Sequence, residues 1–358
     1  MIDGGAGFDV LRFIDPMFGS SFNGFSSQND FLTFVNGYNI SNIERVEEIQ
    51  SGTLSRLFVN GSTAADVIDL SAEVANNYDV RTGSGNDVVT LGAVSGSANL
   101  ALGGGIDIYN GGSSGFVFLL AGSGADIYNG GAAIETISYT FSAVGVNVNL
   151  LTGVGSGGFA AGETYSNIEN ITGTIFADTL IGDANSNTLR GRGGDDIIDG
   201  GAGNDTLETD GGNVTLTGGT GDDLFSFRIF NSSLDGEITD FELGDTLQIG
   251  QFFEATNGFT VPIFIGTAAF SNVVGEIRYE FVSGTTELQL DTDGDGIADD
   301  TLVLSNGEFD ILDTETGFFD LVLAVSPPPI NGTSGNDILN GTVNDLTLIH
   351  ISEPTRPY

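Results

Sequence analysis

The sequence predicts an all-β protein in which short strands alternate with glycine-rich turns. A nine-residue period runs without a shift from Gly173 to Ser226. Glycine occurs 55 times in 358 residues, roughly twice its usual share in proteins. Elsewhere apolar and polar residues alternate, as in Glu287–Asp291, a pattern typical of half-buried strands. These observations indicate a stack of repeated turns flanked by β-sandwich-like or strand-rich segments.

The composition excludes several classes of function. Nine basic residues, all arginine, stand against 49 acidic ones, for a net charge of −40, so we expect no binding to nucleic acid or to anionic membrane surfaces. The chain has no cysteine and a single histidine, His350, which removes disulfide scaffolds, thiol nucleophiles and most histidine-based catalysis. The longest apolar run, Phe116 to Ala121, is too short to span a bilayer. We therefore expect neither an enzyme nor membrane insertion.

The chain divides into segments of different pattern. In order, we expect a partial repeat with strands (1–60), a degenerate repeat array (61–137), a strand-rich insert (138–172), a regular array (173–226), a β-rich capping domain (227–325), a stiff proline linker (326–330), the start of a further repeat (331–348) and a tail (349–358). The tail resembles translated adapter read-through, so we expect it to be non-native. We expect the chain to be a fragment of a longer protein.

The regular array consists of six nonapeptides with two informative positions. The sixth residue is a carboxylate in four of the six, and the eighth is always large and apolar. The sixth residues are Asp178, Asn187, Asp196, Asp205, Val214 and Asp223, and the eighth are Leu180, Leu189, Ile198, Leu207, Leu216 and Phe225. Weaker copies begin at Gly4, Gly61, Thr82, Leu102, Ala121 and Gly332. Asp107 and Asp126 lie 19 residues apart, which predicts a one-residue bulge.

The pattern G-G-x-G-x-D-x-U-x resembles the RTX, or hemolysin-type, calcium-binding repeat. The resemblance implies a right-handed parallel β-roll, in which two nonapeptides form one turn and residues 18 apart stack in a column. The phrases Ile265–Phe270 and Gly275–Tyr279 resemble the β-domain that follows the repeats in serralysin-like proteins.

Stacked glycine turns of this kind suit calcium. Glycine allows tight turns that expose carbonyl oxygens, and calcium takes six to eight oxygen ligands in irregular geometry. The resemblance implies that the best sites lie between Asp178 and Asp196 and between Asp205 and Asp223, with Val214 interrupting the first column. It also implies main-chain ligands at Gly194, Asp195, Gly203, Asn204, Gly221 and Asp222, and further sites at Asp87, Asp107 and Asp126 in the weaker copies. Arg190 and Arg192 are expected to pair with surplus surface carboxylates.

A second candidate site follows a strand near the C-terminal end. Asp291, Asp293 and Asp295 match alternate positions of an EF-hand-type calcium loop, with Asp299 at its ninth position. The twelfth position is Leu302 rather than glutamate, and strand patterns flank it in place of helices. The alternative is a solvated acidic hairpin turn, and the sequence leaves both open.

Other motif matches carry little weight. The G-x-S-x-G match at Gly111–Gly115 and the glycine-rich Gly153–Gly158 are expected by chance in a glycine-rich repeat, and we interpret both as loops.

These patterns and the resemblance together lead to one expectation of function. We expect a calcium-binding, non-catalytic segment of a large bacterial protein that leaves the cell by type I secretion and folds on calcium outside it. Its partners would be calcium ions and an upstream catalytic or adhesive domain of the same chain. The alternatives are an accessory module of a secreted metalloprotease, lipase or polysaccharide-modifying enzyme, or a surface adhesin.

Overall fold

A computed structural model describes most of the chain between residues 9 and 323. The described residues are 9–12, 45–51, 54–61, 63–228, 235–250, 252–254, 258–260, 262–313 and 319–323. They all lie in the first of two compact units, Met1–Ala324, the second being Val325–Tyr358. The proline linker, the further repeat and the tail fall outside the described residues, as does Gly4. No helix among the described residues is long and apolar enough to cross a membrane.

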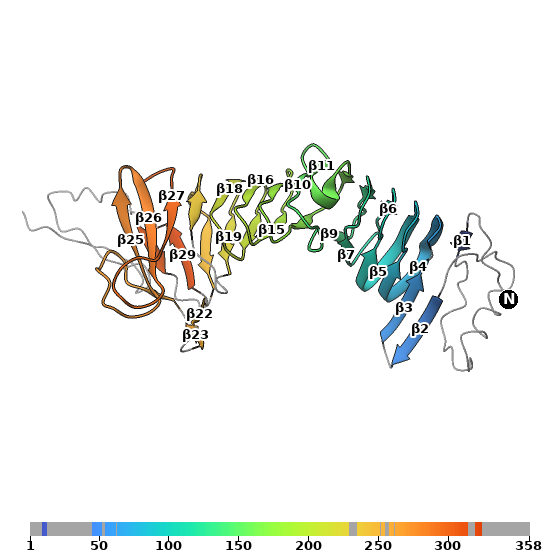
Figure 1. Cartoon of the computed structure of the whole chain (residues 1–358), viewed down its shortest axis with the longest axis horizontal. Helices are drawn as coiled ribbons and strands as arrows, with labels where there is room; N and C mark the ends of the chain where they lie inside the picture. The colour runs from blue at the N-terminus through green and yellow to red at the C-terminus, as the bar shows by residue number, and fades with distance from the viewer. Residues whose placement is uncertain are drawn as a thin grey trace, which may run out of the picture. The chain divides into compact units, whose positions relative to one another are not determined.

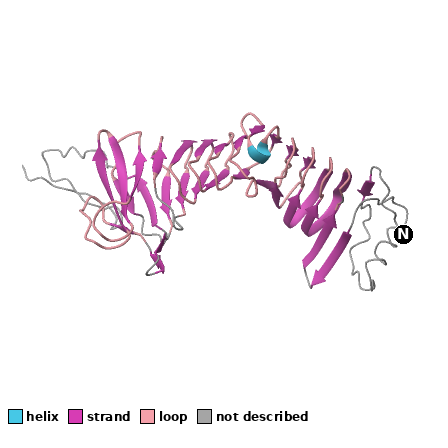
Figure 2. Cartoon of the chain, viewed as in Figure 1, coloured by secondary structure: helices cyan, strands magenta, loops and turns pink. Residues whose placement is uncertain are grey.

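The strands form a parallel β-solenoid of about nine turns, which confirms the predicted β-roll class (Figures 1 and 2). Two ladders of strands make its walls. Ladder A consists of β6 (Ile108–Asn110), β8 (Ile127–Asn129), β12 (Thr164–Ser166), β11 (Val154–Ser156), β10 (Asn147–Asn149), β14 (Thr179–Ile181), β16 (Ile197–Ala202), β18 (Val214–Thr220) and β20 (Gly236–Ile238). Ladder B consists of β7 (Phe116–Leu120), β9 (Ile134–Ser138), β13 (Asn170–Thr172), β15 (Thr188–Arg192), β17 (Thr206–Thr209), β19 (Leu224–Phe227) and β21 (Thr246–Ile249).

The regular array has the predicted 18-residue stacking. Leu180 pairs with Ile198 in ladder A, and Leu207 pairs with Phe225 in ladder B. The eighth residues of all six nonapeptides are fully buried. Each short strand therefore contributes one inward apolar side chain, and the core is a column of these side chains between the two ladders.

The degenerate array has longer turns. Val88 pairs with Ile108, 20 residues on, and Ile108 pairs with Ile127, 19 residues on. The pairing of β6 with β8 has no register shift, so the prediction of a bulge between Asp107 and Asp126 is wrong. The extra residue lies in the loop Gly111–Gly115, which is one residue longer than the matching loop 130–133. A loop accepts an insertion more easily than a hydrogen-bonded strand does.

The insert at 138–172 contributes strands to both ladders. Tyr165 of β12 pairs with Tyr128, and Val148 of β10 pairs with Leu180. Between them β11 runs antiparallel to both neighbours, and a 3₁₀ turn, η1 (Gly158–Ala160), follows it. The stack is therefore continuous through the insert, with one reversed strand in ladder A.

Further strands, in both parallel and antiparallel pairs, flank the solenoid. Before it lie β1 (Asp9–Arg12), β2 (Arg45–Ser51), β3 (Leu54–Asn60) and the long strands β4 (Asp66–Arg81) and β5 (Val88–Ala101), of which β5 joins both ladders. After it lie β22 (Phe252–Glu254), β23 (Gly258–Thr260), β24 (Ile263–Phe264), β25 (Glu276–Val282), β26 (Thr285–Asp291), β27 (Asp300–Leu304), β28 (Ile311–Asp313) and β29 (Phe319–Leu323). The strand predicted at Glu287–Asp291 is part of β26.

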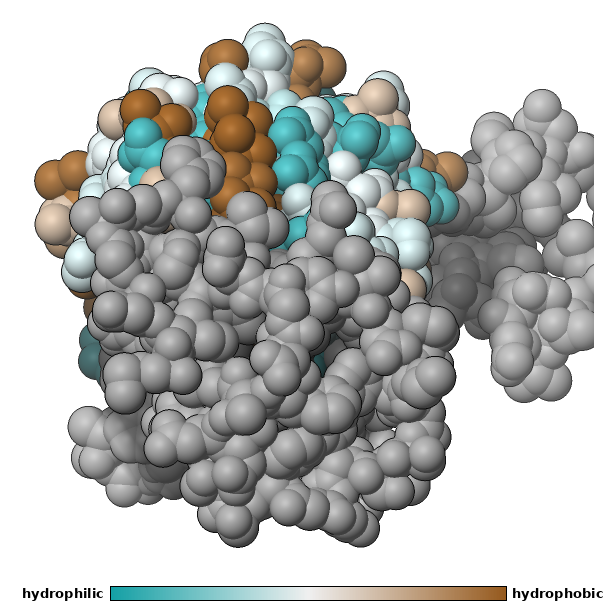
Figure 3. Space-filling model, turned by 90° about the vertical axis from the view of Figure 1, so that its right-hand side faces the viewer, coloured by the Kyte–Doolittle hydropathy of each residue, from teal (hydrophilic) through white to brown (hydrophobic). Residues whose placement is uncertain are grey.

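Apolar side chains also occur on the outer surface. Phe116, Phe118 and Ile134 are about half exposed on neighbouring strands β7 and β9. Figure 3 shows apolar and hydrophilic side chains beside one another on the face seen there. Phe116 pairs with Ile134, so these side chains lie next to one another on the surface.

Neighbouring residues of β16 give a matched test of the core. Ile198 is fully buried, whereas Ile197 is 53% exposed. We expect Ile198→Ala to lower the free energy of unfolding by about 2 to 5 kcal/mol and Ile197→Ala to change it far less. Urea denaturation of both variants at the same calcium concentration measures the difference. Equal effects would contradict the inward and outward assignment.

Candidate metal sites

The sixth-position aspartates of the regular array form a ladder of buried carboxylates. Asp178, Asp196, Asp205 and Asp223 are at most 3% exposed. The Asp178 amide donates to Asp196 Oδ1 at 2.9 Å, and the Asp205 amide donates to Asp223 Oδ1 at 2.8 Å. Aspartates 18 residues apart therefore lie in contact and inside the coil, as the repeat predicts.

The second oxygen of these carboxylates is the chemically important one. Oδ2 of Asp196 and of Asp205 is buried and accepts no hydrogen bond, and the same holds for Asp87 and Asp107. A Cβ on Gly191 would overlap Asp196 Oδ2, so the repeat needs glycine there. A buried carboxylate oxygen without a partner is costly. A hard divalent cation would satisfy it, and calcium prefers such oxygens. These residues fit the ion that the repeat implies.

Burial also changes how these carboxyls titrate. Burial raises the pKa of Asp196 and of Asp107 to about 7 and that of Asp205 to about 6. Neighbouring carboxylates, Asp178 for Asp196 and Asp223 for Asp205, raise these pKa values further. Burial likewise raises the pKa of Asp87, Asp126, Asp178 and Asp223. A bound cation would offset both the burial and the repulsion.

The residues before these aspartates lie on the outside of the turns. Asp195 Oδ1 accepts the Asn213 amide at 2.9 Å, and Asn204 Oδ1 accepts the Asp222 amide at 3.2 Å. Gly194, Gly203 and Gly221 have φ of 118°, 118° and 136°, a conformation that favours glycine. The side chains of Asp195 and Asn204 therefore bond to the next turn. That main-chain oxygens bind calcium stays a prediction for Gly194, Asp195, Gly203, Asn204, Gly221 and Asp222.

One nonapeptide has an apolar residue at the sixth position. Val214 occupies the sixth position in ladder A and is 1% exposed, so the column of carboxylates stops at Asp196. The same nonapeptide begins with Thr209, whereas the other five all begin with glycine. Thr209 is buried, and its hydroxyl accepts the Gly211 amide at 3.2 Å. Glycine at the first position makes room for the carboxylate of the sixth. Because Val214 replaces that carboxylate, the larger Thr209 fits at the first position.

Stacked carboxylates also occur before and after the regular array. The Asp87 amide donates to Asp107 Oδ1, and the Asp107 amide donates to Asp126 Oδ1, both at 2.8 Å. Asp66, the sixth residue of the weaker copy at Gly61, was not among the predicted sites, yet its amide donates to Asp87 Oδ1 at 2.7 Å. Asp245, whose Oδ1 accepts the Asp223 amide at 2.9 Å, was also not predicted. The signal for Asp245 was Gly-Asp-Thr-Leu at 244–247.

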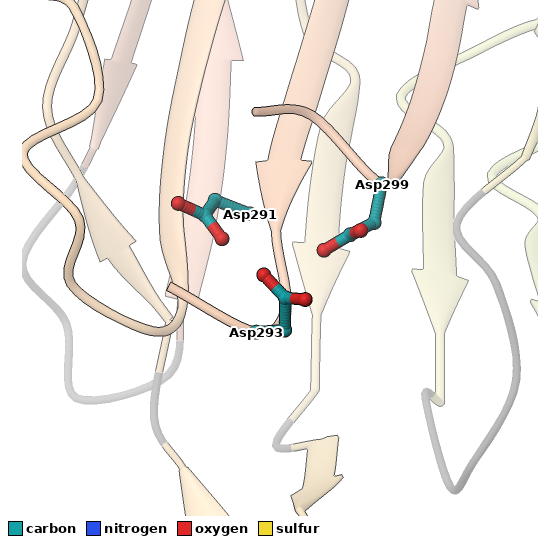
Figure 4. Close-up of side chains that lie close together, drawn as sticks. All are labelled: Asp291, Asp293 and Asp299. Carbon is teal, nitrogen blue, oxygen red and sulfur yellow. The ribbon is translucent and has the colours of Figure 1, made fainter. Parts of the chain in front are cut away.

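The acidic loop between β26 and β27 brings three carboxylates together (Figure 4). Carboxylate oxygens of Asp291, Asp293 and Asp299 lie within 4.8 Å of one another, the one such group of three found among the described residues. Asp295 is outside this group, and its Oδ1 accepts the Ile297 amide at 2.8 Å. Asp299 was visible in the sequence as the ninth loop position. The strands on either side pair antiparallel, so the loop is also a hairpin turn.

Arginines neutralise some of the surface charge. Arg190 donates to both carboxylate oxygens of Asp210, at 2.8 and 2.9 Å, as expected. Arg228 pairs with Glu208 at 3.0 Å. Arg192 lies close enough to Asp178 to oppose the rise in its pKa. These pairs are part-exposed and contribute little to stability.

Comparison with known families agrees with this geometry. The RTX calcium-binding nonapeptide repeat matches residues 172–207, 200–231 and 330–343, in four copies. The chain contains RTX calcium-binding repeats. The match covers the regular array and the repeat predicted to restart at Gly332. No curated protein matches the chain. The serralysin-like character of the segment after the array stays a prediction.

The raised pKa values predict how pH acts in calcium-free buffer. Unfolded aspartates titrate near pH 4, whereas Asp205 and Asp196 in the fold titrate at about 6 and 7. Between these values the folded state holds more protons, so its stability falls as pH rises from about 4 to 7. We expect more β-structure by circular dichroism at pH 5 than at pH 8 without calcium, and little difference in saturating calcium. A β signal that grows with pH in calcium-free buffer would contradict this assignment.

Adjacent aspartates allow a matched test of the ligands. Asp196 is buried, whereas Asp195 is exposed and bonds through Oδ1 only to the next turn. Removing one ligand charge lowers calcium affinity, so we expect Asp196→Asn to weaken binding about tenfold or more. Asp195→Asn keeps the acceptor oxygen and should leave affinity nearly unchanged. Calorimetric titration of both variants distinguishes them, and equal losses would show that the buried carboxylate has no special role.

Proposed function

We propose that the chain is a non-catalytic, calcium-dependent β-roll segment of a secreted bacterial protein. It remains unfolded at the low calcium of the cytoplasm and folds outside the cell. An upstream catalytic or adhesive domain of the same protein would use it as a folded, calcium-stabilised module. The observation that carries the proposal is the ladder of buried carboxylates with unpaired oxygens at Asp196 and Asp205.

The coupling of folding to calcium has a physical basis. Each nonapeptide of the array buries one large apolar side chain, or two in the nonapeptide with Val214, which is too little to offset the entropy lost by ordering nine residues. The same fold also brings buried carboxylates into contact, and their repulsion opposes closure. A cation removes this repulsion and adds ligand bonds, so binding free energy becomes folding free energy.

A calcium titration tests the proposal. We expect the full chain to show little β-structure by circular dichroism in chelator and to gain it between micromolar and millimolar calcium. Magnesium at the same concentrations serves as the control, because its strict octahedral geometry suits irregular turns poorly. A complete β signal in chelator would contradict the coupling of folding to calcium.

A further inference from the structure

A further pair of stacked carboxylates, buried Glu135 and half-buried Glu169, lies outside the residues that the RTX family matches. Residues 130–138 and 164–172 have the spacing of the repeat, with Glu135 and Glu169 in the sixth position and Ile137 and Ile171 in the eighth. The structure stacks them, because Ile137 of β9 pairs with Ile171 of β13. Both isoleucines are buried at 1% exposure or less. These two turns are therefore structural repeats of the coil.

The two glutamates have the contact seen between stacked aspartates. The Glu135 amide donates to Glu169 Oε2 at 2.9 Å, as the Asp178 amide does to Asp196 Oδ1. Glu135 is fully buried, and its Oε1 accepts the Gly131 amide at 3.1 Å and the Tyr109 hydroxyl at 3.2 Å. Its Oε2 is buried and has no hydrogen-bond partner. One carboxylate oxygen is thus left unsatisfied beside a second carboxylate.

Glu163 is another buried glutamate, and its hydrogen bonds differ from those of Glu135. Glu163 is 1% exposed, and the hydroxyls of Tyr139, Tyr165 and Tyr128 donate to its oxygens, that of Tyr165 at 2.7 Å. Both of its oxygens have protein donors, so Glu163 needs no cation. Glu135 has no such donors on Oε2, and no arginine among the described residues forms an ion pair with it or with Glu169.

We propose that Glu135 and Glu169 bind a calcium ion between the turns of β9 and β13. This inference rests on the proposed calcium-dependent fold and extends it to the boundary of the insert. Glu135 Oε2 and the Glu169 carboxylate supply negative oxygen ligands, which a hard cation prefers. Tyr109 holds Oε1 in place and leaves Oε2 free for the ion. The rival arrangement is a proton shared by the two carboxyls, since burial and the charge of Glu169 raise the pKa of Glu135 to about 7.

Counting bound ions separates the two arrangements. Equilibrium dialysis of the full chain at pH 7.5 should show one calcium ion fewer per chain for Glu135→Gln and for Glu169→Gln. Glu135→Asp keeps the charge and should keep the ion. Glu287 is half-buried on β26, so Glu287→Gln is the matched control and should lose no calcium ion. An unchanged ion count in both glutamine variants means a shared proton and overturns the proposal.

Asp205→Asn distinguishes failure of this site from failure of the proposed function. If Asp205→Asn loses calcium and Glu135→Gln does not, the repeats bind calcium and the glutamate site is refuted. If the wild-type chain binds no calcium, both proposals fail together.

If a glutamine variant fails to fold, terbium luminescence gives a second test of the site. The chain has eight tyrosines and no tryptophan, so terbium bound near Tyr109 would emit after tyrosine excitation. Tyr109→Phe leaves both carboxylates in place and should lower this emission, and unchanged emission would overturn the proposal.

Discussion

The structure depends on one constraint: it places carboxylates on successive turns, inside the coil and in contact with one another. Asp178 and Asp196, and Asp205 and Asp223, are linked by amide-to-carboxylate hydrogen bonds. These bonds fix the stacking of turns. Asp196 Oδ1 accepts the Asp178 amide and Asp205 Oδ1 accepts the Asn187 amide, but Oδ2 of both aspartates is left without a donor. The glycine that begins the nonapeptide, such as Gly191, is required because the carboxylate fills the space that a side chain would take. The same buried carboxylates therefore determine the geometry of the turns and create the charge that a cation must compensate.

Much of this arrangement could be predicted from the sequence. The fixed nine-residue period of the regular array determines which residues stack, so contacts such as Asp178 with Asp196 follow from counting. The apolar eighth positions predict the core in the same way, because one inward side chain per strand leaves no other arrangement. The acidic loop was visible through Asp291, Asp293 and Asp299, but the exclusion of Asp295 from the group depends on how the hairpin closes.

The rest could not be predicted because the period varies. Asp245 follows Asp223 by 22 residues and Glu169 follows Glu135 by 34, so counting in nines finds neither pair. The length of a loop is decided by local turn geometry, while stacking depends only on the strands. For the same reason the extra residue between Asp107 and Asp126 lies in a loop, and the reversed strand β11 has no signature in the periodicity.

The nonapeptide with Thr209 and Val214 shows that shape and ligation are separable properties of the repeat. Its strand β18 keeps register with β16 and β20 on either side, and Leu216 stays in the core. The architecture is thus preserved with an apolar eighth residue even where the sixth has diverged to a buried valine. Such a chain can gain or lose individual ion positions by single substitutions, and its affinity for calcium can evolve one turn at a time on an unchanged scaffold.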